Sequence, residues 1–549
     1  MTAKTRITAL PVLLISALAL LSNGSAAAEV ARPADSFVDS IGVNTHTFYT
    51  DTAYYKRFDL IKARLAELGV RHVREELMSD REDQYERLRE LAGIGVKSTL
   101  ILGEPGNEDL PELLSILKDE LRGDVAAVEG ANEFDSRGGA GWANELRGHQ
   151  LGIYSAIKSD PALTGLPVVG PSIVHHSKQR ELGDISGDLD YGNIHSYPDG
   201  YSPEVNLSKH LGEAAHNSGA KQLMATETGY HTALGWSGEH NPVSEAAMAT
   251  YVPRMFLEYF RRGVARTFSY ELLDEAAGSG EREDNFGLLH NDFSPKPAFV
   301  ALRNTIEILR DSGGAFAPGS LDYDFGGDSG DLHHLLLQKS DGTFYIALWR
   351  AIDVWDPETQ SALPDNPRPV QVQFSREVEN AAVYAPNASA GPIGTLPSGG
   401  SLELPVGAQV TIVRFDAGKA VRQPGRIKLW VSRRSVPAGG RVAVKGRLPA
   451  AAATTAPRVK VQHWRGRKRG GWKTIGVGRA SRRGVFRKAL RISPARFGRV
   501  PRLRVIAQTA KPSRIVRLRV RGRRGRSGRK VGVGAARLVS PAPTGPTSG

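Results

Sequence analysis

The 549-residue sequence predicts an α/β protein in which a (β/α)8 TIM barrel is followed by a β-sandwich and a second, Ig-like β domain. Three observations predict this order. Strand-like and helical segments alternate eight times between residues 37 and 312, which is the size of such a barrel. Strand-like segments alone follow, at 313–417 and 424–522. From residue 417 onward the chain has 37 Lys and Arg but no Asp or Glu, whereas 1–416 have 35 basic and 58 acidic residues. Such an abrupt change of charge predicts a domain boundary near Ala417.

The N-terminal segment has the pattern of a secretory signal peptide. Lys4 and Arg6 precede the apolar run Ala9–Leu21, and small residues follow as far as Ala28. We expect residues 1–28 to be removed, which would make the protein secreted or associated with the cell surface, without a membrane span. A retained anchor is the less favoured alternative, because the apolar run is short for a bilayer.

The sequence contains no cysteine. This excludes cysteine nucleophiles, thiolate metal sites and disulfides, so an exported chain must be held together by core packing.

The strands of the predicted barrel are short apolar runs that end in polar or glycine residues. They are expected at Ser40–Asn44, Val70–Glu75, Val96–Gly103, Val125–Asn132, Leu166–Ser172, Tyr191–Tyr197, Lys221–Glu227 and Arg266–Glu271. Helical patterns lie between them, as in Asp59–Gly69, where Ile61, Leu65 and Leu68 share one face and Gly69 supplies the stop. An open doubly wound sheet is the alternative, but no glycine-rich phosphate loop follows the first strand.

Catalytic groups of a (β/α)8 barrel lie at the carboxyl ends of its strands. We therefore take the polar and aromatic residues at these ends, and one loop tryptophan, as site candidates. They are Asn44 and His46, Arg74, Asn132 and Glu133, His195 and Tyr197, Glu227, Trp236, and Tyr270.

Glu133 and Glu227 follow the predicted fourth and seventh strands, 94 residues apart. Both should project into the same mouth of the barrel. A glycosidase needs such a pair, with one protonated carboxyl to release the leaving oxygen and one carboxylate to attack the anomeric carbon. Arg74 and Tyr197 can donate hydrogen bonds to Glu227 and keep it ionised. The charge of Glu227 would then raise the pKa of Glu133, as the acid requires.

Asn132 and His195 complete the predicted site. Asn132 directly precedes Glu133 and can both position it and bond a sugar hydroxyl, while His195 can line the floor. The alternative for all these residues is ordinary packing and surface ion pairing at the barrel mouth.

Residues 40–415 resemble glycoside hydrolase clan A. The resemblance rests on Asn132-Glu133 after strand 4, Glu227 after strand 7, His195-x-Tyr197 after strand 6 and Arg74 in strand 2. Within the clan the chain looks closest to families 5 and 39. The resemblance implies a β-glycosidic bond, net retention of configuration, a catalytic Glu133 (acid/base) and Glu227 (nucleophile), and no cofactor or metal.

One position departs from the clan. Many members have a tryptophan at the end of strand 8 as a sugar platform, and Tyr270 stands there in this chain. Other aromatic residues in predicted loops or strand ends are candidates for stacking on a sugar: Phe48, Tyr49, Trp142, Tyr230 and Trp236.

The two β-rich segments have different expected roles. The sandwich at 313–417 is predicted to pack on the barrel as a structural domain. The basic domain at 424–522 resembles Ig-like repeats of exported enzymes, and its charge favours an anionic cell-envelope polymer as partner. Trp464, Trp472 and Phe486 alternate with basic residues, a pattern that formally suits single-stranded nucleic acid, but nucleic acid is disfavoured for an exported protein. Alternatively, arginines simply fill exposed strand faces. Residues 523–549 are low in complexity and predicted to be disordered.

The sequence thus predicts a secreted retaining glycoside hydrolase that acts on a polysaccharide or oligosaccharide. Two alternatives remain: a non-catalytic polysaccharide-binding or polyanion-binding cell-envelope protein on a barrel scaffold, and an adhesin whose basic domain does the binding. Neither the sugar nor the choice between internal and terminal cleavage follows from the sequence.

Overall fold

The computed structural model describes residues 28–106, 110–326 and 329–420 in the first part of the chain. Beyond these it describes 428–433, 435–437, 440–448, 458–464, 472–481, 485–491, 502–507, 516–517 and 519–521. The predicted signal peptide, up to residue 27, and the predicted tail lie outside the described residues. The chain divides into two compact units, Met1–Val421 and Arg422–Gly549.

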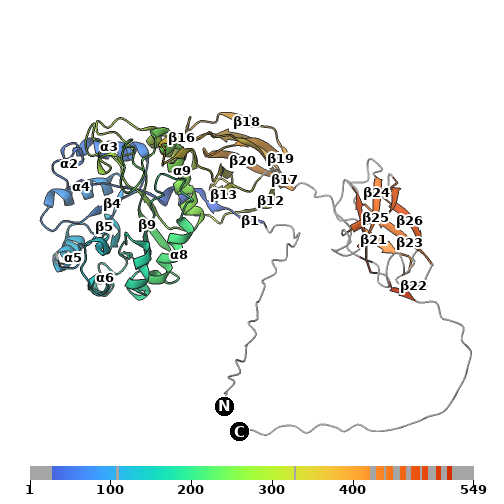
Figure 1. The fold of residues 1–549 in the computed structure, drawn as a ribbon, viewed down its shortest axis with the longest axis horizontal. Coiled ribbons are helices and arrows are strands. Elements are labelled where there is room, and N and C mark those ends of the chain that lie inside the picture. The colour runs from blue at the N-terminus through green and yellow to red at the C-terminus, as the bar shows by residue number, and fades with distance from the viewer. Residues whose placement is uncertain are drawn as a thin grey trace, which may run out of the picture. The chain divides into compact units, whose positions relative to one another are not determined.

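Eight parallel strands form the barrel of the first unit (Figure 1). They are β3 (Ile41–Asn44), β4 (His72–Glu76), β5 (Lys97–Ile101), β6 (Val125–Glu129), β7 (Val168–Val169), β8 (Gly192–His195), β9 (Leu223–Thr228) and β10 (Thr267–Ser269). Their order is β7-β6-β5-β4-β3-β10-β9-β8. A parallel bridge between Val169 of β7 and Tyr191, directly before β8, joins the two ends of this order. The closed ring confirms the (β/α)8 barrel, and the open-sheet alternative is wrong.

The helices that follow the strands surround this barrel in Figure 1. They include α3 (Phe58–Leu68), α4 (Glu82–Gly93), α5 (Leu110–Asp119), α6 (Trp142–Ser159), α8 (Leu207–Ser218), α9 (Glu245–Arg261) and α10 (Pro297–Leu309). α3 buries Ile61, Leu65 and Leu68, the apolar face expected from the sequence. It ends at Gly69, whose φ of 81° is a left-handed conformation that glycine adopts without strain.

Strands β7 and β10 are shorter than the sequence predicts. β7 has two residues where seven were expected, and β10 ends at Ser269 rather than Glu271. Beyond both strands the chain keeps single backbone hydrogen bonds to its neighbours, from Ser172 to Ala131 and from Tyr270 to Thr228, but no longer forms the regular ladder of a strand. The apolar pattern of a sequence indicates which residues are buried, and burial at the barrel mouth extends beyond the ends of the strands.

The β domain packs against α9 and α10. Its strands include β12 (Tyr323–Gly326), β13 (Leu332–Gln338), β14 (Phe344–Arg350), β17 (Arg368–Tyr384), β18 (Gly394–Leu396), β19 (Gly399–Val406) and β20 (Thr411–Ala420). A two-residue N-terminal strand, β2 (Arg32–Pro33), pairs with β13. One hydrophobic core runs from the barrel helices into β13 and β14, and includes Met255, Phe299, Leu337 and Trp349. Barrel and β domain therefore form one compact unit, although the sequence predicts two domains.

Two details of the β domain differ from the prediction. The apolar runs 370–374 and 381–384 predict two separate strands, but both are parts of the single 17-residue strand β17. Its first half pairs with β12 and β19, and its second half pairs with β18 and β20, so these strands belong to one hydrogen-bonded sheet. β20 also continues past the predicted boundary at residue 417 as far as Ala420.

The second unit is built from short strands in separate small sheets. β21 (Lys428–Val431), β23 (Arg441–Arg447) and β26 (Val485–Arg491) form one, and β24 (Arg458–Trp464), β25 (Trp472–Arg479), β27 (Arg502–Ala507) and β28 (Val516–Arg517) form another. Phe486 on β26 is 3% exposed in the core of this unit, so it is not free to stack on a base. Across the described part of the chain, no helix has both the length and the apolarity to span a membrane.

Candidate active site

A cavity of about 750 Å3 lies at the carboxyl ends of the barrel strands. Nine of the ten candidate residues line it: Asn44, His46, Arg74, Asn132, Glu133, His195, Tyr197, Glu227 and Tyr270. Trp236 does not line it. Its indole nitrogen donates to the carbonyl of Glu239 within its own loop, 3.1 Å away. The nine candidates chosen because they lie at or near strand ends thus line the cavity, whereas the one chosen from a loop does not.

Backbone and side-chain contacts fix Glu133 at the edge of the cavity. Its φ of 49° lies in the left-handed region, between β6 and the turn η1 (Phe134–Ser136). Its backbone nitrogen donates to the hydroxyl of Ser172 at 3.0 Å, and that hydroxyl donates to Asn132 at 3.1 Å. A Cβ atom at Gly130 would lie 2.2 Å from the side chain of Gln150 and 3.0 Å from the backbone of Pro171. The chain therefore needs glycine at 130 to bring Glu133 into place.

Glu227 receives hydrogen bonds on both carboxylate oxygens. Nη1 of Arg74 donates to Oε1 at 2.6 Å, and the hydroxyl of Tyr197 donates to Oε2 at 2.8 Å. Both bonds hold the carboxylate in one orientation. This is the arrangement predicted from the sequence, and it suits a nucleophile that must be an anion.

Arg74 is held by a second carboxylate, Glu129, that the sequence analysis missed. Nε and Nη2 of Arg74 each lie 2.8 Å from an oxygen of Glu129, which is fully buried at the end of β6. Asn193 and Thr226 also donate to Glu129, each at 3.0 Å. Burial lowers the pKa of Arg74, but the charges of Glu129 and Glu227 raise it above its ordinary value. The arginine is therefore a fixed cation between the two carboxylates.

His195 joins the two candidate catalytic residues. Its Nδ1 lies 2.7 Å from Oε1 of Glu133 and 3.5 Å from Oε2 of Glu227. Its Nε2 lies 3.0 Å from the hydroxyl of Thr226, whose single proton is directed at Glu129 or at Asn193. Because that hydroxyl proton is used there, Nε2 of His195 must carry a hydrogen and donate it. One further proton then lies between Nδ1 of His195 and Glu133, and these two groups share it.

The pKa of Glu133 differs in direction from the expectation. Burial raises it, but the hydrogen bond and charge of His195, together with the charge of Arg74, lower it below the usual value. Burial lowers the pKa of His195, while the charges of Glu227 and Glu133 raise it above the usual value. Both directions favour a protonated imidazole beside an ionised Glu133. The expectation rested on the charge of Glu227, whereas the imidazole of His195 lies at hydrogen-bond distance from Glu133.

The two candidate catalytic carboxylates are close together. One oxygen of Glu133, one of Glu227 and a ring nitrogen of His195 all lie within 4.8 Å of one another. Such a group has the donor types of a metal site. The positive charge of Arg74, which contacts Glu227, opposes a cation there and takes the place that a metal would have.

Aromatic side chains form part of the cavity wall. Phe48, Tyr49 and Tyr270 line it, and Tyr270 lies edge-on to Phe286, with 5.3 Å between ring centroids. Two stacking candidates are wrong, because Trp142 is 4% exposed and Tyr230 is 2% exposed within the core. Aromatic residues in predicted loops had no periodicity that could separate wall positions from core positions.

No family model and no curated protein matches the chain. Solved structures similar to it include a family 39 glycoside hydrolase from Bacteroides cellulosilyticus WH2, with 17% identity, 70% of this chain and 81% of that chain covered, and a TM-score of 0.49. A glucosidase from Croceicoccus marinus is 13% identical in sequence. The match covers 65% of this chain and 91% of the glucosidase, with a TM-score of 0.43. The bacterial orthologue of human α-L-iduronidase is 14% identical in sequence. The match covers 89% of this chain and 98% of the orthologue, with a TM-score of 0.41.

Proposed function

We propose that the protein is a retaining glycoside hydrolase that cleaves β-glycosidic bonds by double displacement. The separation of Glu133 and Glu227 carries this proposal. An oxygen of Glu133 and an oxygen of Glu227 lie no more than 4.8 Å apart, which fits the short separation of roughly 5–5.5 Å between the carboxyls of retaining glycosidases. Inverting enzymes need about 6.5–9.5 Å to hold a water molecule between the carboxyls.

In the first step Glu227 attacks the anomeric carbon. The carbon–oxygen bond to the leaving group breaks, its electron pair goes to the leaving oxygen, and Glu133 protonates that oxygen. A covalent glycosyl ester of Glu227 forms. In the second step Glu133, now a carboxylate, takes a proton from water, and the water oxygen displaces Glu227 with the configuration restored.

The contact with His195 supports the acid role of Glu133. The acid must hold a proton near neutral pH, yet the hydrogen bond and charge of His195 lower the pKa of Glu133. The proton shared with Nδ1 of His195 removes this difficulty, because it lies one hydrogen bond away, at 2.7 Å. A bound sugar that excludes water would favour the uncharged pair, with the proton on Glu133, because burial penalises two charges more than none.

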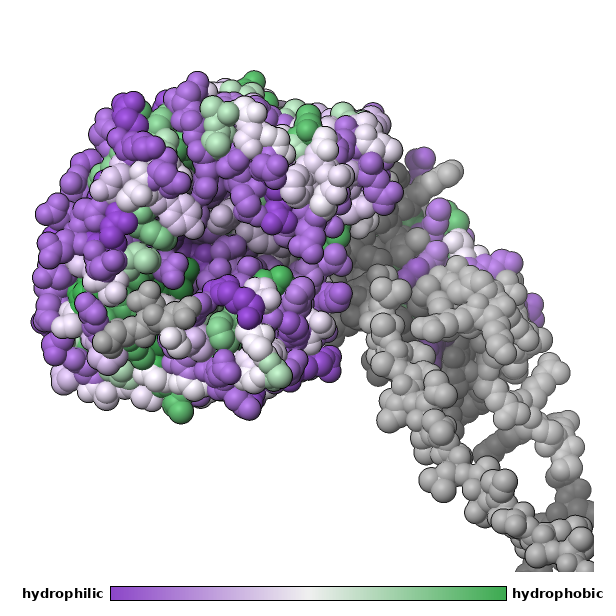
Figure 2. Space-filling model, turned by 60° about the vertical axis from the view of Figure 1, so that its left-hand side comes forward, coloured by the Kyte–Doolittle hydropathy of each residue, from purple (hydrophilic) through white to green (hydrophobic). Residues whose placement is uncertain are grey.

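The surface fits a polar substrate. On the face shown in Figure 2, hydrophilic residues predominate and hydrophobic residues are scattered. The cavity is lined by charged side chains and has an aromatic wall, the combination that binds sugar hydroxyls and stacks on sugar rings. We infer a polysaccharide or oligosaccharide as substrate.

The proposal also covers where the protein is located and what holds it there. The signal-like N-terminus indicates export, and the absence of acidic residues from 417 to 549 favours binding to an anionic cell-envelope polymer. A non-catalytic polysaccharide-binding protein is the rival, and both carboxylates in hydrolytic arrangement argue against it.

Trapping of the nucleophile tests the proposal. The protein is incubated with 2-deoxy-2-fluoro β-glycosides that carry good leaving groups and differ in the sugar, and intact mass and labelled peptides are measured. A label on Glu227 is expected, and it would identify the sugar next to the cleaved bond. A label on another residue, or polysaccharide binding by wild type and Glu133→Ala without turnover of any glycan, would overturn the mechanism.

A further inference from the structure

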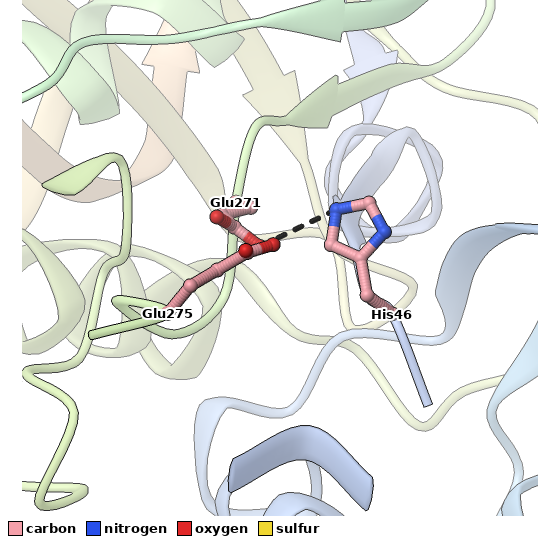
Figure 3. A group of neighbouring side chains, drawn as sticks. All are labelled: His46, Glu271 and Glu275. Atoms are coloured by element: carbon pink, nitrogen blue, oxygen red, sulfur yellow. Dashed lines mark ion pairs between the residues drawn. The ribbon is translucent and has the colours of Figure 1, made fainter. Parts of the chain in front are cut away.

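We infer that His46, Glu271 and Glu275 form a binding site for a divalent transition-metal ion of the zinc type, beside the catalytic cavity. Figure 3 shows the imidazole of His46 directed at the two carboxylates, which lie next to each other. Ligand atoms of the three side chains all lie within 4.8 Å of one another. The site is distinct from the pair Glu133 and Glu227 and goes beyond the proposed hydrolysis.

The distance between His46 and Glu271 fits two ligands of one ion. Nε2 of His46 lies 3.4 Å from Oε2 of Glu271. This buried Nε2 has no hydrogen-bond partner among the described residues, so the contact is not a hydrogen bond. Two atoms at tetrahedral positions, each about 2.1 Å from a zinc ion, are separated by about 3.4 Å. One imidazole and two carboxylates are also the donor types that such an ion takes.

Glu271 has unmet bonding capacity in a fully buried position. Its side chain is not exposed at all, and its Oε1 has no hydrogen-bond partner within the described chain. Its Oε2 accepts a hydrogen bond from the hydroxyl of Tyr54 at 2.8 Å. Tyr54 is itself buried, so it holds the carboxylate in one orientation, as residues around metal ligands do.

No side-chain cation balances the two carboxylates. No Lys or Arg in the described ranges forms an ion pair with Glu271 or Glu275, and Lys296, the nearby lysine, contacts Asp274 at 2.8 Å.

The position of the site suggests what the ion does. His46 follows β3, whereas Glu271 and Glu275 follow β10, so an ion joins the loops after the first and last strands of the barrel. His46 and Tyr270, the neighbour of Glu271, both line the cavity. The ion would therefore hold one wall of the cavity in place. Glu275 is part-exposed, which leaves an entry path from solvent.

Metal binding to the full chain, without a histidine tag, tests the inference. Protein treated with a chelator and dialysed is titrated with Zn²⁺ by calorimetry at pH 7.5, and its melting temperature is measured with and without the ion. Wild type should bind one equivalent of Zn²⁺, and the ion should raise its melting temperature. Glu275→Gln should show neither the binding nor the rise. The matched control is Glu281→Gln, an exposed glutamate on the same loop, which should behave as wild type.

A second pair of measurements separates this site from others. Glu133→Gln should retain the equivalent, because the inference places the ion outside the group of Glu133, His195 and Glu227. Co²⁺ bound to wild type should give visible absorption bands that are absent from Glu275→Gln. Binding that Glu275→Gln leaves intact, binding lost in Glu133→Gln, preference for Ca²⁺ over Zn²⁺, or no binding by wild type would each overturn the inference. None of these readouts depends on hydrolytic activity.

Discussion

Arg74 and Glu129 form a two-point ion pair beneath the cavity, with both nitrogen–oxygen distances at 2.8 Å and both side chains almost fully buried. The same guanidinium reaches Glu227 at 2.6 Å. The position of the proposed nucleophile is thus fixed by a carboxylate that does not itself line the cavity. This arrangement makes Arg74 a structural residue as well as a site residue.

Replacement of Arg74 should destabilise the fold. Arg74→Met leaves Glu129 buried without a counter-charge, which costs about 3–5 kcal/mol of unfolding free energy. Urea unfolding at pH 7 measures the loss. Arg71→Met is the control, because its partner Asp35 is one-third exposed and the pair should contribute under about 1 kcal/mol. Arg74→Met/Glu129→Gln should be more stable than Arg74→Met; an equally unstable double variant would contradict the buried-charge explanation.

Loss of the Tyr197 hydroxyl should impair catalysis with little effect on folding. Tyr197→Phe removes the 2.8 Å hydrogen bond to Oε2 of Glu227. A hydrogen bond to a charged group contributes about 1.5–3 kcal/mol, so kcat/KM should fall roughly 10- to 100-fold. The substrate is the aryl glycoside of the sugar found by trapping. Tyr230→Phe, whose hydroxyl donates to the carbonyl of Tyr201 away from the cavity, should keep wild-type kinetics. Equal losses of kcat/KM in both variants would contradict a catalytic role for the hydrogen bond from Tyr197 to Glu227.

Removal of the His195 imidazole should shift the pH profile of kcat/KM. In wild type the pair of His195 and Glu133 keeps its shared proton until the raised pKa of His195 is passed, so the alkaline limb lies above about 6.5. In His195→Gln the carboxyl of Glu133 alone holds that proton, and the alkaline limb should move to lower pH. His72→Gln, at the opposite end of the strands, is the control. An unmoved limb would mean that Glu133 holds its proton without His195.

Acid should destabilise the protein partly through His210. Burial, with the charge of Lys209, lowers the pKa of His210 to about 4. The unfolded value is near 6.5, so the folded state prefers the neutral ring. The stabilisation is complete above pH 6.5 and is lost as the pH falls towards 4. Between pH 7 and 4.5, His210→Asn should lose about 2 kcal/mol less unfolding free energy than wild type. Urea unfolding at both pH values measures this, and parallel losses would refute the assignment.

The two compact units should have separable functions. A chain that ends at Val421 keeps the whole first unit, so its kcat/KM on a soluble substrate should stay within about 2-fold of wild type. Its retention on an anionic polysaccharide resin at low salt should be lost, since the basic residues of 422–549 are gone. Undiminished retention would place polyanion binding on the first unit.

Much of the fold follows from the sequence, because every predicted barrel strand overlaps an observed one. The alternation of apolar runs and amphipathic helices depends on local geometry and survives folding unchanged. The predictions that failed concern burial and pairing. Trp142 and Tyr230 are core residues, and two expected strands are one strand, β17, whose two halves pair with different neighbours.

By itself, the sequence determined the order of strands and helices and the polar residues that end each strand. From these, the barrel and the pair Glu133 and Glu227 could be predicted, since parallel strands in a closed ring place their carboxyl ends at one mouth. Only the tertiary structure decided the distances between side chains. Glu129 under Arg74, the shared proton of His195, and the meeting of His46 with Glu271 and Glu275 depend on ring closure. Closure brings β3 beside β10, more than 200 residues later in the chain, and no local pattern records such a contact.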